Sequence, residues 1–373
     1  MKNVMGVIYT GEKDSFLREL TLMRAIAALP VAGRYRVIDF MVSSMVNSGM
    51  RNVGVIMQKN YHSLMDHLGS GKEWDLHGKN DGLYILPPFL TRENVGVYNG
   101  SLDALHSNMN YLQRSRQEYV LLCNSLILFN ANFKDLFASY AASGADVMMM
   151  YTKNPEMQRP EYGTYFDVAE NGEIIDVEID PTKPRYQNTS MEVLIMRKDL
   201  LIDMVDRGAA HGYHEMVRDV LQRAVRDGGL KVHGYEYKDI CFRLDSVQSY
   251  FKLNLALLDT KTRHELFQEE RPVYTKVRDQ LPARYMENAK VINSMIADGC
   301  IIDGTVDHSV LFRGVKIAKG ATVKNCILMQ DCQIEEGVHL ENCILDKQAV
   351  IKRGGNLIGP SAYPIVISKN MVI

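Results

Sequence analysis

The 373-residue chain has almost no net charge, because 45 Asp and Glu residues balance 43 Lys and Arg residues to give −2. It also lacks long apolar runs. Val120–Leu122 and Leu126–Phe129 are typical, and they fall far short of the about 20 residues that cross a bilayer. The apolar stretch at the N-terminus ends at Glu12, too early for a secretory signal. We therefore expect a cytoplasmic protein with no nucleic-acid or membrane partner.

Cysteines are few, and none lies in a CxxC motif or at metal-ligand spacing from a histidine. They are Cys123, Cys241, Cys300, Cys326, Cys332 and Cys343. This pattern is typical of reduced, mostly buried thiols in a cytoplasmic protein. The single tryptophan, Trp74, and the ten histidines are interpreted as packing or surface residues.

Short β-branched runs alternate with amphipathic helical patterns over about the first 240 residues. The expected buried parallel strands are Val4–Tyr9, Asn52–Met57, Tyr119–Leu122 and Asp146–Tyr151, and the expected helices are Arg36–Ser48, Tyr61–Leu68, Ser101–Arg114 and Ser246–Leu266. Tyr165–Val168 and Ile174–Ile179 predict a hairpin, which makes the sheet mixed. The pattern predicts a Rossmann-like α/β domain over residues 1–265, followed by a linker at Glu269–Pro272, with ligands at the carboxyl ends of the strands.

Residues 280–373 have a different periodicity, in which small aliphatic residues recur about every six positions. Ile317, Val323 and Met329 are six apart, as are Cys326 and Cys332. This period predicts a hexapeptide parallel β-helix. His308–Gly314 interrupts the register, and two unrelated hairpins are the alternative interpretation.

A specific motif lies between Ala25 and Leu68, where the chain contains GRYRVIDF, then NSG, then Q-x-x-x-x-S-L. With Tyr98-Asn-Gly-Ser-Leu-Asp103, these motifs resemble the glucose-1-phosphate adenylyltransferases, the ADP-glucose pyrophosphorylases of glycogen and starch synthesis. The resemblance covers essentially the whole chain. It implies a GT-A-type nucleotidyltransferase domain with a mixed sheet, joined to a left-handed β-helix.

The family reaction joins glucose 1-phosphate to the α-phosphate of ATP and releases pyrophosphate. It needs cations to offset phosphate charge and carboxylates to hold Mg²⁺. The resemblance implies residual nucleotide contacts at Gly11, Gln58, Tyr98, Gly100 and Asp103, and residual sugar contacts at Glu178 and Ser190. Asp39 and Asp103 fit equally well as helix caps or structural acceptors.

Several positions depart from the family pattern where charge is needed. Phe16 stands at the phosphate-loop arginine, Ile26 at the motif lysine and Ile179 at the sugar-phosphate lysine. Asn124 replaces a metal-binding aspartate, and Asn130 replaces an aspartate six positions on. Arg243 aligns with the second metal carboxylate, although a small shift would offer Asp245. We therefore expect no metal and no cofactor.

A basic set of residues matches the family's effector site, which lies between its domains and takes phosphate or sugar phosphates. Its members are Arg24, Arg36, Arg313 and Lys316, with Arg34 nearby. Guanidinium groups suit phosphate oxygens. A solvated basic surface is the alternative interpretation.

A retained fold with degraded chemistry indicates a non-catalytic, regulatory D-type subunit, expected to pair with a catalytic homologue in a heterotetramer and raise its activity. One alternative is a slow enzyme that uses Asp245. Another is a sugar-nucleotide or phosphate sensor that acts without a partner. A hexapeptide acyltransferase is a weaker alternative, because no motif supports His308 or His339 as its catalytic histidine.

Overall fold

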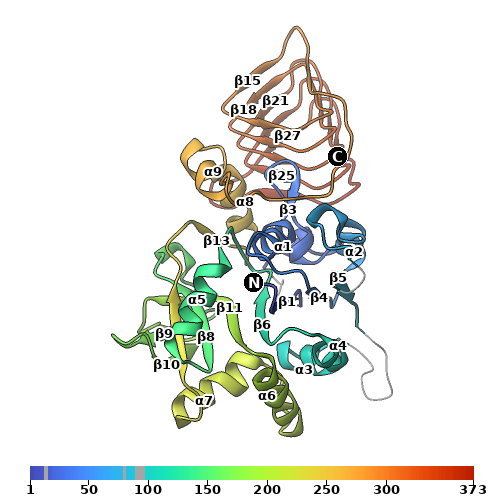
Figure 1. The fold of residues 1–373 in the computed structure, drawn as a ribbon. Helices are drawn as coiled ribbons and strands as arrows, with labels where there is room; N and C mark the ends of the chain where they lie inside the picture. Colours follow the sequence, from blue (N-terminus) through green and yellow to red (C-terminus); the bar gives the residue numbers. More distant parts are fainter. Residues whose placement is uncertain (12–15, 79–80, 89–96) are drawn as a thin grey trace. The chain divides into compact units, whose positions relative to one another are not determined.

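The computed structural model describes residues 1–11, 16–78, 81–88 and 97–373 (Figure 1). The described chain divides into two compact units. The sheet unit contains described residues of 1–12, 40–242 and 269–273, and the β-helix unit contains those of 13–39, 243–268 and 274–373. The domain boundaries predicted at 265 and 280 stay predictions.

The sheet unit is built on a nine-stranded mixed sheet, seven of whose strands run in the order β10-β9-β11-β6-β1-β4-β5. These strands are β1 (Val4–Tyr9), β4 (Val53–Ile56), β5 (Leu83–Leu86), β6 (Tyr119–Asn124), β9 (Thr164–Val168), β10 (Ile174–Ile179) and β11 (Asn188–Arg197). Strand β1 is parallel to β4 and β6, whereas β11 is antiparallel to β6. The predicted hairpin is confirmed as β9–β10. Strand β8 (Val147–Thr152) pairs antiparallel with β11 and parallel with β12 (Val232–Glu236).

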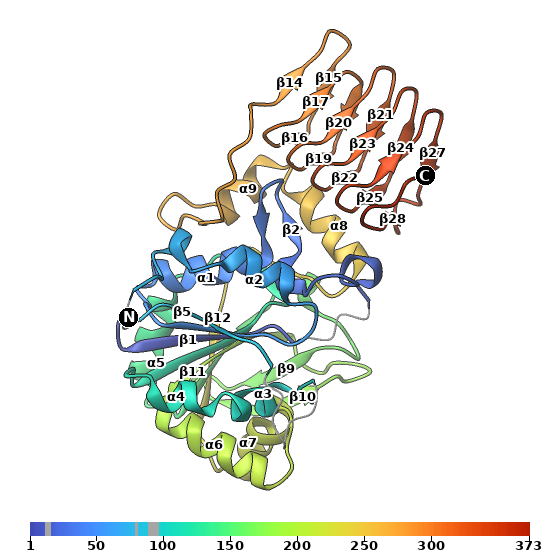
Figure 2. The ribbon, with the colours of Figure 1, turned by 90° about the vertical axis from the view of Figure 1, so that its right-hand side faces the viewer.

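Helices cover both faces of this sheet (Figure 2). They include α1 (Val37–Asn47), α2 (His62–Leu68), α3 (Ser101–Ser107), α4 (Met109–Arg114), α5 (Phe133–Ser143), α6 (Lys198–Ala210) and α7 (Gln222–Asp227). One face packs on α3, α4 and α6 through an apolar cluster that includes Val7, Leu102 and Leu201. The prediction of one helix over Ser101–Arg114 was wrong. The Asn108 side chain donates to Ala104 O at 2.8 Å, and such local bonds compete with a continuous helix.

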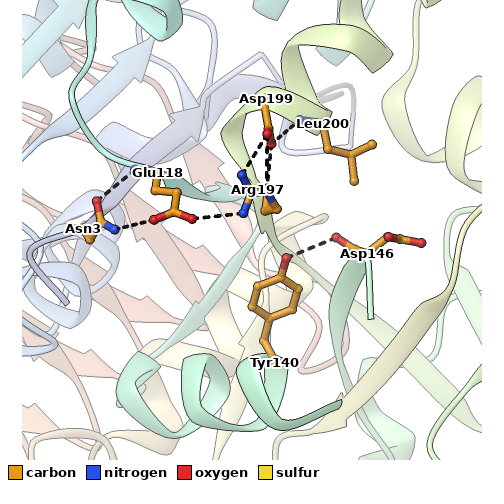
Figure 3. Close-up of polar contacts among 7 residues, drawn as sticks. All are labelled: Asn3, Glu118, Tyr140, Asp146, Arg197, Asp199 and Leu200. Carbon is orange, nitrogen blue, oxygen red and sulfur yellow. Dashed lines mark hydrogen bonds and ion pairs between the residues drawn. The ribbon is translucent and has the colours of Figure 1, made fainter. Parts of the chain in front are cut away.

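Polar side chains link three neighbouring strands, β1, β6 and β11 (Figure 3). They lie at the amino ends of β1 and β6, opposite the carboxyl ends of these two strands. Glu118 accepts from Asn3 Nδ2 and from Arg197 Nη1, both at 3.0 Å. Arg197 also pairs with Asp199 at 2.9 Å. These groups are substantially exposed, so their ion pairs contribute little to stability. Their effect is to order this edge, away from the expected ligand site.

The β-helix unit contains three parallel five-stranded sheets that fit a left-handed β-helix (Figure 2). The first sheet contains β14 (Arg284–Tyr285), β17 (Ile301–Ile302), β20 (Lys316–Ile317), β23 (Gln333–Ile334) and β26 (Val350–Ile351). The second contains β15 (Lys290–Ile292), β18 (Thr305–Asp307), β21 (Thr322–Lys324), β24 (His339–Glu341) and β27 (Asn356–Ile358). The third contains β16 (Met295–Ile296), β19 (Val310–Leu311), β22 (Ile327–Leu328), β25 (Cys343–Leu345) and β28 (Ile365–Ile367).

The six-residue period is slightly irregular. Ile317 pairs with Ile334 and Ile334 with Ile351, each 17 positions along, so one coil is shorter than three hexads. Val323 and Leu328 complete the buried series between Ile317 and Ile334, with one step of five residues. Leu328, not the predicted Met329, therefore belongs to the β-helix core.

The third β-helix sheet is buried on both faces. Val310, Ile327 and Ile344 point away from the β-helix core, yet each is fully buried. Gly33 approaches this face, because a Cβ on Gly33 would lie 3.7 Å from Leu311 O. An apolar outer face suits a sheet that packs on another segment, and here that segment is distant in sequence.

The rest of this unit includes the pair β2 (Pro30–Val31) and β3 (Tyr35–Arg36), with helices α8 (Val247–Ala256) and α9 (Thr260–Leu266). The prediction of one helix over Ser246–Leu266 was wrong. Ser246 forms a capping box at the start of α8, and Asp259 accepts from Thr262 N at 2.8 Å to begin α9 separately.

The six cysteines are all free and buried, as predicted. Trp74 is 1% exposed and packs edge-on against His67, which confirms its role in the core. In the part of the chain that the structure describes, no helix is long and apolar enough to cross a membrane.

Candidate functional site

Three predicted nucleotide-side residues meet at the carboxyl ends of β1 and β4. Gln58 accepts from Tyr9 Oη at 2.9 Å and donates through Nε2 to Tyr98 O at 2.6 Å. A Cβ on Gly11 would lie 1.9 Å from Gln58 Oε1, so the backbone here approaches Gln58 too closely for any side chain. The structure thus brings Gly11, Gln58 and Tyr98 together. The phosphate loop that the resemblance places at residues 11–17 is described only in part, because residues 12–15 lie outside the described residues.

Two carboxylates of the motifs, Asp39 and Asp103, have structural partners. Asp39 accepts from Arg36 N at 2.9 Å, and Asp103 accepts from Asn99 N at 3.0 Å, so each caps the start of its helix. A Cβ on Gly100 would lie 2.4 Å from His214 O, which gives that glycine a packing reason. The interpretation of Asp39 and Asp103 as helix caps therefore has direct support.

The asparagines at the aspartate positions are engaged by backbone. Asn124 ends β6, and its Oδ1 accepts from Leu126 N at 3.0 Å. Asn130 is buried and donates to Arg271 O at 2.8 Å. A neutral amide supplies no charge for Mg²⁺, which is typically held by carboxylates. Across the described residues, no three or more His, Cys, Asp and Glu side chains form a group that could hold a metal. The amides of Asn124 and Asn130 therefore do not fit Mg²⁺ at the two aspartate positions.

Three of the positions that depart from the family pattern belong to the β-helix unit. Phe16 is 44% exposed, and Ile26 is buried in a short 3-10 helix. Arg243 is buried, and its Nε donates to Asp245 Oδ2 at 3.0 Å. The carboxylate that would serve a displaced metal is thus already neutralised by the arginine two positions before it.

On the sugar side, the retained residues also have partners within the chain. Glu178 on β10 pairs with Arg185 Nε and accepts from Arg185 N at 3.0 Å. Ser190 on β11 is buried and accepts from Glu192 N at 3.0 Å. Ile179, at the position of the sugar-phosphate lysine, packs against the apolar cluster of the sheet unit.

In the β-helix unit, Arg24 forms a buried ion pair. Its Nη2 lies 2.8 Å from Asp346 Oδ1 and 2.9 Å from Oδ2, and both side chains are 3% exposed. Asp346 directly follows β25, and Arg36 is also buried. Of the other predicted effector residues, Arg313 is buried, whereas Lys316 is exposed on β20.

Lys347 joins this basic group, which sequence reasoning missed. Burial, followed by the charges of Arg36 and Arg24, lowers the pKa of Lys347 to about 7, and Asp346 opposes that shift. Burial, and then Arg278 and Arg34, lower the pKa of Arg313. In the sequence, Lys347 was marked only by its place beside Asp346, after a β-helix strand. We name Arg24, Arg36, Arg278, Asp346 and Lys347 the basic cluster.

The fold and these motifs define a nucleotidyltransferase scaffold with a hexapeptide β-helix. The nucleotidyl transferase family model matches residues 5–258, and a C-terminal hexapeptide model described as GlmU-like matches residues 281–362. The chain belongs to the nucleotidyl transferase family.

Within that family, three similar relatives come from two organisms. Glycogen biosynthesis protein GlgD of Bacillus subtilis (strain 168) is 34% identical over 85% of this chain and 81% of its own length. The GlgD protein of Geobacillus stearothermophilus is 37% identical over 86% and 82%, and the glucose-1-phosphate adenylyltransferase of the same organism is 30% identical over 86% and 83%. These relatives support a role in glycogen biosynthesis for the group.

Proposed function

We propose that this chain is a non-catalytic, activating subunit of glucose-1-phosphate adenylyltransferase in bacterial glycogen synthesis. The observation that carries the proposal is Asn124 at the strand end, where an amide engaged by Leu126 N stands at the position of a metal carboxylate. Two relatives called glycogen biosynthesis protein GlgD support the assignment of the pathway. The partner would be a catalytic homologue, in a cytoplasmic hetero-oligomer of tetramer size.

The residues at the reaction centre indicate that this chain, when isolated, does not catalyse the family reaction. Phosphoryl transfer depends on cations placed where charge develops, and losing one such group commonly costs about 10²–10³ in rate. Phe16, Ile26 and Ile179 stand where the resemblance places three such cations. These losses do not simply add, yet together they leave little catalysis.

A slow but genuine enzyme is the first rival. It needs Asp245 as a metal ligand, and that carboxylate lies 3.0 Å from Arg243 Nε, where the guanidinium satisfies it and repels a cation. A stand-alone sensor is the second rival. The retained Gly11, Gln58 and Tyr98 geometry fits either a sensor or a subunit, so partner binding decides between them.

The basic cluster would take the effector, a phosphate or sugar phosphate. Asp346 pairs with Arg24, and Arg36, Arg278 and Lys347 lie close enough to act on the same group of charges. A bound anion would offset the repulsion that lowers the pKa of Lys347. Arg313 would extend the site, whereas Lys316, exposed on β20, would contribute less.

Light scattering coupled to size-exclusion chromatography tests the partnership. The chain is mixed with the catalytic adenylyltransferase of the same organism, and each protein is also run alone. We expect one species near the mass of a tetramer that contains both chains. Two separate peaks at micromolar concentrations would favour the stand-alone sensor.

A further inference from the structure

The sheet unit has a cavity that the candidate site does not use. Its volume is about 490 Å³, within the range of about 300–1,000 Å³ that is typical of small-molecule sites. It is lined by residues at the start of α5, by Met150 of β8, by the residues that end and follow β12, and by Arg271. All of these residues belong to the sheet unit. Among the described residues that line the cavity, none is a predicted nucleotide, sugar or effector residue.

Part of the cavity lining is apolar and aromatic. Phe133, Leu136 and Met150 line it, and all three are buried. Tyr237 is also buried, and its hydroxyl donates to Asn130 O at 3.2 Å, which holds this tyrosine in place at the cavity. Such a lining suits a ligand that presents an apolar face.

The rest of the lining is charged, and its charges balance. The Arg271 guanidinium lies 2.9 Å from Asp239 Oδ2. Glu236 accepts at 3.0 Å from a lysine that lies outside the lining. Asp135 and Lys238 are exposed and complete the set. With the outside lysine included, the three carboxylates are matched by three cations.

Tyr235 of β12 lines the cavity near its carboxylates. Burial, followed by the charges of Asp135 and Asp239, raises the pKa of Tyr235, so its hydroxyl stays protonated at neutral pH. The ring supplies an apolar face, and the hydroxyl supplies a donor at one edge. Asp135 accepts from Asn132 Nδ2 at 3.1 Å. A carboxylate has about four acceptor positions, so Asp135 keeps capacity for a ligand.

The balanced charges and the aromatic rings favour one class of ligand. A ligand with net charge of either sign would meet like charges in this lining, whereas a neutral ligand rich in hydroxyl groups can donate to the carboxylates and accept from the cations. We propose that the cavity is a carbohydrate site that takes a glucose unit, with Tyr235, Asp135 and Arg271 as its principal contacts. The choice of glucose rests on the proposed function, because glycogen is a glucose polymer. The source of the unit is free glucose or the end of a glucan chain.

Calorimetric titration of glucose and of maltotriose, a short glucan, into the isolated protein tests this inference. Tyr235→Ala removes the aromatic ring from the cavity. Asp135→Asn removes a charge and keeps the shape of the side chain, so it decides the outcome if the tyrosine variant does not fold. Tyr285→Ala and Asp203→Asn are the matched controls, because both side chains are exposed and both residues lie outside the cavity lining.

We expect wild type to bind maltotriose with a millimolar or lower dissociation constant, and both cavity variants to weaken this binding by about tenfold or more, with the controls unchanged. Tighter binding of maltotriose than of glucose assigns the site to a glucan chain, and equal binding assigns it to a single glucose unit. No binding of either sugar by wild type, or an affinity that the cavity variants retain, would overturn the inference. The readout is sugar binding by this chain alone, and it does not depend on whether a catalytic partner is activated. The inference and the proposed function can therefore fail separately.

Discussion

Arg24 and Asp346 lie 322 positions apart in sequence, yet they form a two-pronged buried ion pair at 2.8 and 2.9 Å. Asp346 also accepts from Lys347 N at 2.7 Å, so one carboxylate organises the basic cluster. Removing one partner of a buried pair leaves an uncompensated charge, which costs more than the pair contributes. This relationship makes the cluster both a structural element and a candidate anion site.

Asp346→Ala should lower the free energy of unfolding by about 3–5 kcal/mol, because Arg24 stays buried without its counter-charge. Denaturant titration followed by fluorescence measures the change. Glu341→Ala is the control, since it removes a more exposed ion pair with Lys324 and should cost less than about 1 kcal/mol. Equal losses in both variants would show that burial of the Arg24 pair carries no special cost.

Lys347 should make stability depend on pH. Its pKa is about 7 in the folded protein, whereas an unfolded lysine titrates near about 10.4. Between these values the unfolded state binds more protons, so the stability of wild type should rise with pH by up to about 1.4 kcal/mol per unit relative to Lys347→Met. Parallel stability curves from pH 7 to 10 would contradict the burial of this amine.

Phosphate binding should follow the same cluster. Arg36→Gln removes a charge-assisted contact and should weaken phosphate binding by about tenfold or more in calorimetry. Affinity should also fall as pH rises above about 7, because Lys347 loses its proton among Arg24, Arg36, Arg278 and Asp346. Lys319→Gln, on the exposed surface, is the matched control. Unchanged phosphate affinity in Arg36→Gln would show that the basic cluster does not bind phosphate and has a structural role only.

Asn124→Asp alone should not restore ADP-glucose synthesis. The change returns one carboxylate, but Phe16, Ile26 and Ile179 still supply no positive charge to the phosphates. A coupled pyrophosphate-release assay with Mg²⁺ present measures the outcome. Mg²⁺-dependent turnover of about 1 per second or faster would show that the metal ligand was the principal defect.

Local pattern predicted much of the fold. Strand β1 coincides with its predicted bounds, Val4–Tyr9, because a buried parallel strand is a continuous apolar run. The β9–β10 hairpin and the β-helix followed from period and turn residues. The helix breaks at Asn108 and Asp259 were missed, because the apolar period continues through them. At Asn108 a side-chain bond to Ala104 O competes with the helix, and at Asp259 a side-chain bond to Thr262 N begins a new one.

The candidate site was predictable only where a motif is contiguous. Gln58 and Tyr98 were found, and their contact joins residues 40 positions apart. The Arg24–Asp346 pair and the position of Lys347 beside it depend on a contact between an N-terminal segment and the residues that follow β25. These segments are distant in sequence, so no local pattern predicts the contact. The cavity lined by α5, β12 and Arg271 likewise combines segments that only the folded chain brings together.

The central claim is tested by ADP-glucose synthesis measured for this chain alone, for its catalytic homologue alone, and for the two mixed at equal concentration. The account predicts almost no turnover by this chain, and a mixture severalfold more active than the homologue by itself. Turnover by the isolated chain at rates typical of enzymes, about 1–10³ per second, would contradict it. So would a mixture no faster than the homologue alone.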